Sequence, residues 1–420
     1  MIQLQEHDVI EGVVNQEERF EHLSLVSWNK PMDNNPWGYY VSYKIGAEWI
    51  DDEEALVVTA KRGMENIDFL SMFMTCFSSN LAIESFSEIY SINLSQSPID
   101  APSLKGVLSP LIVLHFLGVV SRIKALKKGY VSHSGNLKKI KGRVRILKNE
   151  RSNIALKRYD RIYCDYNEYS LDIPENRLLK KALLYSKRFI LKIGESHLSY
   201  NMIKQMLSRS LALFENVSSD VELKEIQQIK CHKLFKEYSE AIRLAKLVLS
   251  NFDYSINKVS DNNAKVMPFT LDMSLLYEHY VYGLLSKAYN DRISYQFKGN
   301  TGYPDFLYRS VEFKAILDTK YIPKYKNDVM LDTYVVRQLS GYSRDLAILR
   351  HLGYQDIDEE SPTPSTPCVI IYPENSGNPI NPFLNMHLRD LCKDRVYGLS
   401  QFYKISVPIP LIESAVGLIP

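Results

Sequence analysis

The chain has 420 residues, 45% of them hydrophobic, and a formal net charge of +2, which describes a globular protein large enough for two or three domains. Its five cysteines form no C-x-x-C pair, so the pattern of a disulfide scaffold or a zinc site is missing and a reducing cytoplasm is the expected compartment. The N-terminus lacks the basic start and apolar run of a signal peptide. The most apolar stretch, Val107 to Val120, is about 14 residues long, short of the roughly 18 to 20 that span a bilayer, so we expect a buried helix and no membrane segment.

The first 60 residues are acidic, with twelve acids against three bases, a balance of −9 that the net charge conceals. Alternating side chains over residues 38–45 and 55–60 predict strands, and this part is expected to be a small β-rich unit. An acidic face does not suit DNA. A contact with another protein and a merely solvated surface are the two interpretations left open.

A strongly basic segment follows two predicted helices over residues 64–90 and 104–128. From Arg122 to Arg161 fourteen Lys or Arg stand against two acids, a balance of +12. Within it, Gly142 to Leu147 alternates like a strand that puts its arginines on one face. Such a segment can follow a phosphate backbone or dock on an acidic partner, and both interpretations stay open. The candidate binding residues are Lys138, Lys139, Lys141, Arg143 and Arg145.

The middle of the chain, residues 174–250, has the composition and periodicity of helices and begins with Pro174, which suits the first helical position. Residues 251–268 are polar and predict a linker into the last part of the chain. We interpret this region as a structural helical spacer.

Residues 303–321 predict a β-hairpin with a tight turn at Arg309 and Ser310. The second strand is apolar and then ends in charge, at Asp318 and Lys320. Ionisable groups directly after a buried strand must be compensated or functional. Because these two residues are two positions apart, their side chains point to the same face.

A second carboxylate, Asp305, follows Pro304 on the partner strand. Two carboxylates can hold a hard cation such as magnesium, with manganese as the alternative, and a neighbouring ammonium can orient an attacking water or offset charge on a phosphate. Glu312 and Lys314 form a rival acid and lysine pair on the same strand. The predicted turn would place Lys314 or Ala315 opposite Asp305, so the strand register does not decide between the two pairs.

The elements around the hairpin add three further candidates. The sequence predicts a helix, three strands, a helix and a strand, with the helices over Leu271–Tyr289 and Val329–Leu352 and the last strand over Pro367–Tyr372. Glu278 lies on the first helix. Gln338 and Tyr342 lie four residues apart, and hence on one face, of the second helix.

This combination of motifs resembles a known family. Pro-Asp, a spacer and Asp-x-Lys resemble the PD-(D/E)xK nuclease signature, and the order of elements is that of the restriction-endonuclease core. Together with Glu278, Gln338 and Tyr342, and with the segment Cys164 to Leu183, they resemble McrC, the nuclease subunit of McrBC-type modification-dependent restriction systems. The resemblance covers roughly residues 140 to 410, and no motif is recognised before residue 120.

The resemblance implies an α/β chain, α+β overall, in three parts. These are a β-rich N-terminal partner-binding domain over residues 1–170, a helical spacer over 171–262 and a PD-(D/E)xK endonuclease domain over 263–420. It implies that Asp305 and Asp318 bind Mg²⁺, which Glu278 joins directly or through a water. Lys320 would position or activate the attacking water, and Gln338 would help to hold that assembly.

The resemblance also implies the partners. The chain has no G-x-x-x-x-G-K-[ST] phosphate loop, so we expect it to bind no nucleotide itself. GTP hydrolysis and recognition of the modified base would belong to an AAA+ GTPase of the McrB kind, while this chain cuts DNA. Whether two copies associate to cut both strands is left open. The alternatives are a stand-alone DNA repair nuclease and a non-cutting DNA-binding or assembly scaffold with a nuclease-like fold.

Overall fold

The computed structural model describes residues 1–10, 19–29, 37–76, 88–93, 95–193, 200–221, 236–256, 265–326, 331–355, 357–360, 364–375 and 380–412. Contacts divide the chain into two compact units, Met1–Leu111 with Lys258–Pro420, and Ile112–Asn257. The first and last parts of the sequence thus share one unit. The predicted boundaries near residues 170 and 262 rest on sequence features and stay a prediction.

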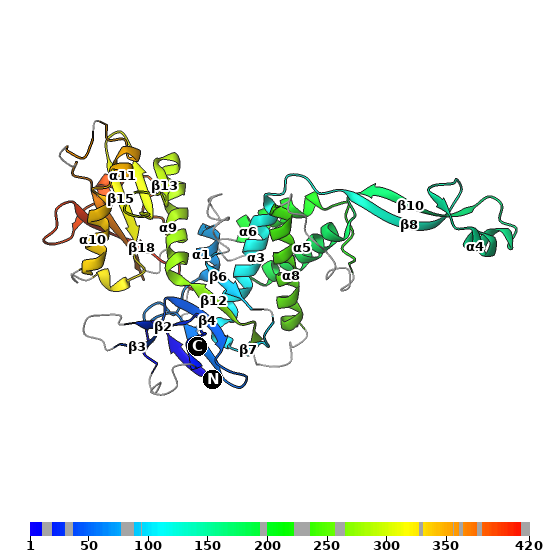
Figure 1. Cartoon of the computed structure of the whole chain (residues 1–420), viewed down its shortest axis with the longest axis horizontal. Helices are drawn as coiled ribbons and strands as arrows, with labels where there is room; N and C mark the ends of the chain where they lie inside the picture. Colours follow the sequence, from blue (N-terminus) through cyan, green and yellow to red (C-terminus); the bar gives the residue numbers. More distant parts are fainter. Residues whose placement is uncertain are drawn as a thin grey trace, which may run out of the picture. The chain divides into compact units, whose positions relative to one another are not determined.

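A five-stranded sheet forms the N-terminal part of the first unit and confirms its predicted β-rich character (Figure 1). Its strands, in spatial order, are β1 (Ile2–Gln5), β5 (Ala55–Thr59), β4 (Lys44–Trp49), β12 (Phe269–Asp272) and β6 (Tyr90–Ile92). Beside it, β2 (Val26–Asn29) and β3 (Gly38–Val41) form an antiparallel pair. The strand β12 comes from a point far along the chain, where the sequence predicted the start of a helix.

Glycine makes the junction between β4 and β12 possible. Gly46 has φ +147°, and a Cβ there would lie 2.0 Å from the carbonyl oxygen of Phe269. Any other residue would separate the two strands, because a side chain cannot occupy the space of a backbone carbonyl.

Helix α1 (Phe69–Cys76) follows the sheet, and β7 (Ile99–Asp100) pairs with β11 (Lys265–Val266). Helix α3 (Lys105–Ser121) confirms the helix predicted over residues 104–128, but it ends seven residues earlier than predicted. By length and composition, Pro102–Ser121 could cross a membrane, but 82% of its most apolar window is buried within the structure, as in the core helix of a globular protein.

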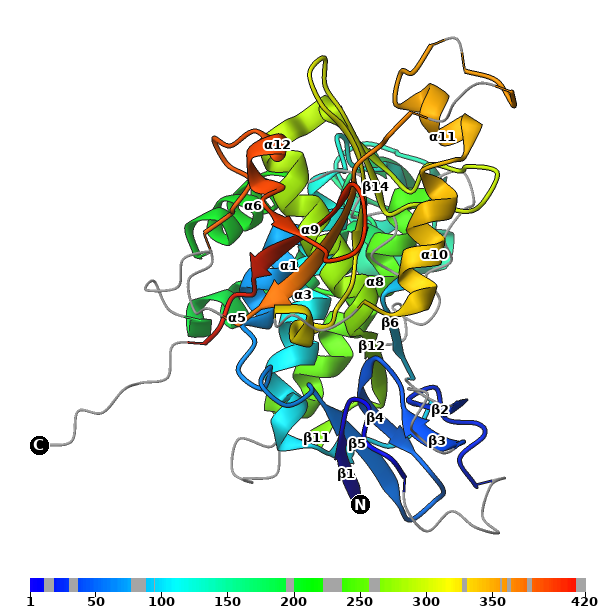
Figure 2. The same ribbon diagram turned by 90° about the vertical axis from the view of Figure 1, so that its left-hand side faces the viewer.

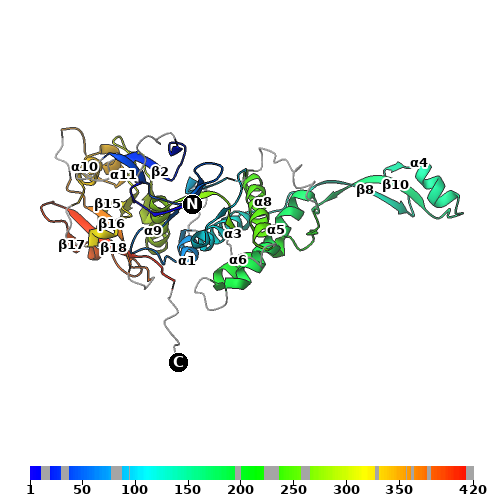
Figure 3. The same cartoon turned by 90° about the horizontal axis from the view of Figure 1, so that it is seen from below.

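The second unit combines helices with a long β-hairpin. The predicted helices are present as α5 (Pro174–Ile193), α6 (Tyr200–Leu213) and α8 (Lys236–Ile256). Strands β8 (Gly129–Leu137) and β10 (Ile162–Ser170) pair along their whole length and project from these helices (Figures 1 and 3). We call residues 129–170 the finger.

The predicted strand from Gly142 to Leu147 is mostly wrong. Strand β9 covers only Arg143–Val144, and helix α4 (Ile146–Asn149) begins two residues later, followed by a π-helical turn over Glu150–Ile154. Beyond Val144 the ladder with β10 ends, so no partner strand holds the chain extended.

A six-stranded sheet forms the C-terminal part of the first unit, with spatial order β13-β14-β15-β16-β18-β17. Its strands are β13 (Ile293–Tyr295), β14 (Phe306–Arg309), β15 (Lys314–Thr319), β16 (Cys368–Glu374), β17 (Asp394–Arg395) and β18 (Phe402–Pro408). Strands β15, β16 and β18 run parallel, and β14 is antiparallel to β15. The predicted order of helix, three strands, helix and strand is confirmed.

Two helices pack on this sheet (Figure 2). Helix α9 (Met273–Tyr289) contributes Tyr282, whose ring stacks on Phe306, while α10 (Thr333–Tyr342) buries Leu339 in a core cluster with Ile316. The predicted helix Val329–Leu352 is two helices, because Asp345 caps a new helix, α11 (Leu346–His351).

Candidate active site

The hairpin of β14 and β15 brings Asp305 and Asp318 together. Phe306 pairs with Leu317, so one step further along the ladder Asp305 lies opposite Asp318. The predicted two-residue turn is wrong. Four residues, 310 to 313, connect the strands, and Ser310 exchanges hydrogen bonds with Phe313.

The corrected register separates the rival pair from the carboxylates. Lys314 lies opposite Arg309, at the other end of the hairpin from Asp305. Its ammonium donates to the Gly353 carbonyl at 2.7 Å, and Glu312 is exposed in the turn. The observed register therefore distinguishes the two pairs, because the four-residue turn replaces the two-residue turn that was predicted.

Asp318 and Lys320 form a close ion pair in a buried place. The Nζ of Lys320 lies 2.5 Å from Oδ2 of Asp318, a residue that is 1% exposed. Within the described part of the chain, Oδ1 of Asp318 has no hydrogen-bond partner. Burial raises the pKa of Asp318 to about 7, the charge of Asp305 adds to this, and Lys320 opposes it.

Asp305 accepts two hydrogen bonds from Thr319, the last residue of β15. Its Oδ2 accepts hydrogen bonds from the backbone N of Thr319 at 2.6 Å and from the Thr319 hydroxyl at 2.5 Å. Burial raises the pKa of Asp305, although the charge of Lys320 and the two hydrogen bonds from Thr319 oppose the rise. The two aspartates therefore share a site in which two negative charges are not fully compensated.

Glu278 approaches the same site from α9. It is 8% exposed, and its pKa is raised to about 8, by burial first and by the charge of Asp305 second. The amide of Gln296 donates to its Oε1 at 2.9 Å, and the backbone N of Gln296 donates to the Asp305 carbonyl at 2.9 Å. Gln296 thus links the helix to the hairpin. Gln296 follows the three-residue strand β13 directly, and no local sequence pattern marks it for such a role.

Gln338 bonds to a tyrosine rather than to the acids. Its Nε2 donates to the Tyr342 hydroxyl at 3.0 Å, and that hydroxyl donates to the Tyr303 carbonyl at 3.2 Å, two residues before Asp305. The Oε1 of Gln338 is buried and has no hydrogen-bond partner among the described residues. The pKa of Tyr342 is raised, by burial first and by the charges of Asp318 and Asp305 among lesser causes, so Gln338 and Tyr342 lie at the border of the carboxylate site.

The donor set fits a magnesium ion held by few protein ligands. Two carboxylates with raised pKa values and an unpartnered buried oxygen favour a hard cation, and Mg²⁺ is usually bound by one or two carboxylates with waters and phosphate. Across the described ranges no three His, Cys, Asp or Glu side chains surround one common position. Of the three predicted ligands, Asp305 and Asp318 lie opposite each other on the hairpin, while Glu278 lies on α9.

The basic candidates Lys138, Lys139, Lys141, Arg143 and Arg145 all lie exposed in the finger. Two are neutralised by acids of β10, which follow the basic segment in sequence. The Nε of Arg145 lies 2.5 Å from Asp165, and Lys141 pairs with Glu168.

The same part of the finger exposes large apolar side chains. They are Ile140, Ile146, Leu147, Ile154, Leu156 and Tyr159. Exposed apolar side chains that gather in one place mark a contact with another molecule more often than a solvated face.

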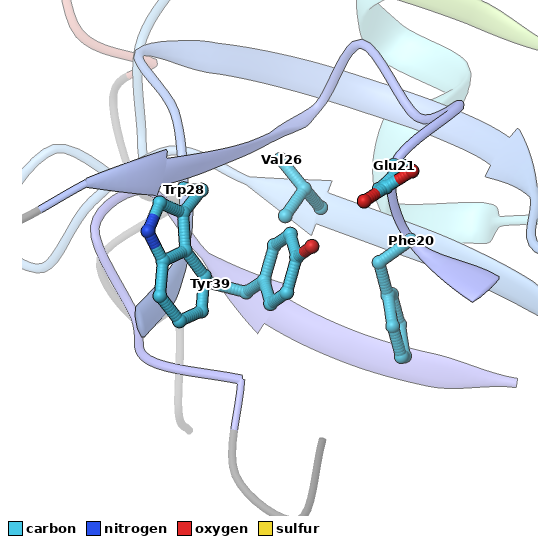
Figure 4. A pocket seen from close by; sticks show the side chains of 5 residues that line it. All are labelled: Phe20, Glu21, Val26, Trp28 and Tyr39. Atoms are coloured by element: carbon cyan, nitrogen blue, oxygen red, sulfur yellow. The ribbon is translucent and has the colours of Figure 1, made fainter. Parts of the chain in front are cut away.

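A separate pocket of about 410 Å³ lies in the N-terminal part (Figure 4). Phe20, Glu21, Val26, Trp28 and Tyr39 line it, and the rings of Trp28 and Tyr39 meet edge to face at 4.8 Å. It contains none of the candidate catalytic residues and brings no pair of acids together.

A comparison with known protein families gives a match over more than half of the chain. A family model described as "McrBC 5-methylcytosine restriction system component" matches residues 97–343, which include Glu278, Asp305, Asp318, Lys320 and Gln338. No match was found among the curated proteins.

Two solved structures from Thermococcus gammatolerans are similar to this chain. One is a half-complex of McrB AAA+ hexamers with bound McrC, at 14% identity, 98% coverage of this chain, 95% of that chain and a TM-score of 0.38. The other is the McrBC complex, at 14% identity, 68% and 87% coverage and a TM-score of 0.33.

Proposed function

Since the chain belongs to the family of McrBC 5-methylcytosine restriction system components, we propose that it is the magnesium-dependent DNA-cleaving subunit of a modification-dependent restriction complex. One observation carries the proposal. The hairpin sets Asp305 opposite Asp318, and Lys320 lies 2.5 Å from Asp318 at the same strand end. Two carboxylates that can hold a metal ion, with an ammonium beside them, are suited to metal-dependent hydrolysis of a phosphodiester.

Each side chain has a separate task in this proposal. Asp305 and Asp318 would hold Mg²⁺, with Mn²⁺ as the alternative, and the bound ion would supply Lewis-acid stabilisation of the phosphate. Lys320, anchored by Asp318, would orient the attacking water and offset charge that develops on the phosphate.

Two further residues support this centre. Gln338 would accept a hydrogen bond from the attacking water through its unpartnered Oε1. Glu278, which accepts a hydrogen bond from Gln296, would face the cation through a water.

The partner in this proposal is an AAA+ GTPase that reads the modified base. The chain carries no phosphate loop of its own, and in the similar Thermococcus gammatolerans assembly McrC is bound to McrB AAA+ hexamers. The exposed apolar side chains of the finger favour a protein over DNA as its contact, because a phosphate backbone offers them nothing to pack against. The complex would work in the cytoplasm.

Reconstitution tests the proposal directly. We expect methylated plasmid to be cut only when this chain, the GTPase partner, GTP and Mg²⁺ are all present. The chain alone should leave the plasmid largely intact, and calorimetry should detect no binding of GTP to it. Rapid cutting of unmodified DNA by the chain alone would favour a stand-alone nuclease. A complete complex that hydrolyses GTP and leaves methylated DNA intact would favour a non-cutting scaffold.

A further inference from the structure

A lysine of the N-terminal part reaches the strand end that carries Lys320. Lys61 follows β5, and its Nζ donates a hydrogen bond to the Tyr321 carbonyl at 2.5 Å. The same ammonium lies 3.4 Å from the centroid of the Tyr321 ring. One cation therefore holds both the backbone and the side chain of the residue next to Lys320.

Buried groups hold Lys61 itself in place. Its backbone N donates to Oε2 of Glu6 at 3.0 Å, and Glu6 is 3% exposed. Burial raises the pKa of Glu6 to about 7, and the charge of Lys61 is the main effect that opposes the rise. A carboxylate and an ammonium that both leave water are retained only where each has a partner, so this pair fixes the turn after β5.

Tyr321 connects Lys61 to two parts of the site, the backbone of Lys320 and helix α9. It is 2% exposed, and its ring lies 5.8 Å from the ring of Tyr277, the residue before Glu278. The chain of contacts from Lys61 thus meets the backbone of Lys320 and the helix that carries Glu278.

Lys320 needs such support because it lies outside the regular strand. Strand β15 ends at Thr319, and the backbone of Lys320 is tied by its N–H to the Ile371 carbonyl at 2.8 Å and by its carbonyl to the N–H of Ile322 at 2.7 Å. Its ammonium must nevertheless meet Asp318 at 2.5 Å. A backbone shift at Tyr321 would move Lys320 away from that position.

We propose that Lys61 is a positioning residue for Lys320, so that the N-terminal sheet is part of the nuclease centre. The inference rests on the proposed function of the carboxylate site. Lys61 acts by fixing the Tyr321 carbonyl and ring. Displacement of a catalytic group by about 1 Å can lower a rate by about 100-fold, so loss of Lys61 should reduce turnover without weakening DNA binding.

Three variants of the full chain test this role in the reconstituted complex. Lys61→Met removes the ammonium and keeps the apolar stem, and Lys61→Arg keeps a cation. Arg62→Met is the matched control, because Arg62 is the exposed neighbouring cation, whose contact is Gln5 at 3.4 Å. We measure kcat and KM with methylated plasmid, and amide hydrogen exchange in the isolated chain.

Lys61→Met should lower kcat about 10- to 100-fold with KM changed less than about twofold, and Lys61→Arg should recover most of the loss. Arg62→Met should behave as the parent. Amide exchange should rise in the peptide over residues 319–322 of Lys61→Met and stay unchanged over 402–408. Parental kcat and exchange in Lys61→Met would overturn the inference.

The two proposals fail in different ways. If the parent complex does not cut DNA, the proposed function fails, and the exchange measurement still decides whether Lys61 fixes Tyr321. If the parent cuts and Lys61→Met cuts equally well, the positioning role alone fails. Should Lys61→Met lower the melting temperature and prevent assembly with the partner, Lys61→Gln takes its place, because it keeps a donor for the Tyr321 carbonyl and discards the charge.

Discussion

The carboxylate site at the end of β15 and the finger both contain many charged side chains. The charges are buried in the carboxylate site and exposed to water in the finger. Asp318 is 1% exposed and Glu278 is 8% exposed, and burial raises the pKa of both. In the finger, Asp165 is paired with Arg145 in water, and hydrogen bonds from Ser134 and Arg145 lower its pKa. Charge that is buried and poorly compensated indicates chemistry, whereas charge that is exposed and paired indicates solubility or recognition.

The largest expected effect comes from removal of the buried charges. Asp318→Asn and Lys320→Ala should each lower DNA cleavage by the complex about 10²- to 10⁴-fold, the range typical of loss of a catalytic acid, base or charge. GTP hydrolysis by the partner should persist, because neither residue lies in the finger. Cleavage of methylated plasmid and release of phosphate from GTP measure the two activities.

Glu312→Ala is the matched control for this prediction. Glu312 belongs to the rival acid and lysine pair and lies exposed in the turn at the other end of the hairpin. Its removal should leave cleavage unchanged. An inactive Glu312→Ala together with an active Asp318→Asn would reverse the assignment of the catalytic pair.

The same contrast explains what the sequence could predict. The sequence pattern predicted that Asp318 and Lys320 point to the same face, because side chains alternate along a strand. This alternation does not depend on the length of the turn that connects the strand to the one after Asp305. The register itself was not predictable, because it depends on a four-residue turn that Ser310 stabilises through Phe313.

Contacts between segments distant in sequence were also not predictable. Gln296, Glu6 and Lys61 reach the site through contacts between segments distant in sequence, which no local pattern encodes. In the finger, the count of +12 stopped at Arg161 and therefore left out Asp165, which pairs back onto the basic segment. The charge count was correct, but acids across the hairpin neutralise part of the basic segment.

A second prediction concerns Glu6 and the pH dependence of stability. Its pKa is about 7 in the folded protein and near 4.5 when unfolded, so the unfolded state loses its proton first as pH rises. The folded state is therefore destabilised progressively from about pH 4.5 to 7. Glu6→Gln should remove this loss and raise the free energy of unfolding of the isolated chain above pH 7 by about 1 to 3 kcal/mol relative to the parent.

Denaturant unfolding at pH 5 and pH 8 checks this expectation. The difference between Glu6→Gln and the parent should be small at pH 5 and should grow toward pH 8. Asp51→Asn serves as a control, because Asp51 is exposed and its pKa is lowered, chiefly by the hydrogen bond from Arg19. A difference that shrinks toward pH 8 would show that Glu6 is ionised in the folded protein at low pH.

The third prediction tests whether the finger recognises its partner through charge. Reversal of Arg143 and Arg145 to Glu should weaken binding of the partner or of DNA about tenfold at low ionic strength, and less at high salt, where screening is stronger. Leu147→Ser should weaken protein binding with little dependence on salt, because its exposed side chain is apolar. If the double variant binds the partner and DNA as tightly as the parent at low salt, these two arginines are solvated surface residues and take part in neither interface.

The smallest effect is expected from Asp165→Asn, which removes the acid that pairs with Arg145 in the finger. Asp165 accepts hydrogen bonds from Ser134 and Arg145, yet all these groups are in contact with water, so the melting temperature at pH 7 should not change measurably. Because the substitution frees Arg145, binding to an acidic surface or to phosphate should become a few-fold tighter at low salt and equal to the parent at high salt. A clear fall in melting temperature would mean that this exposed pair stabilises the fold, and the contrast between buried chemical charge and exposed recognition charge would then not hold.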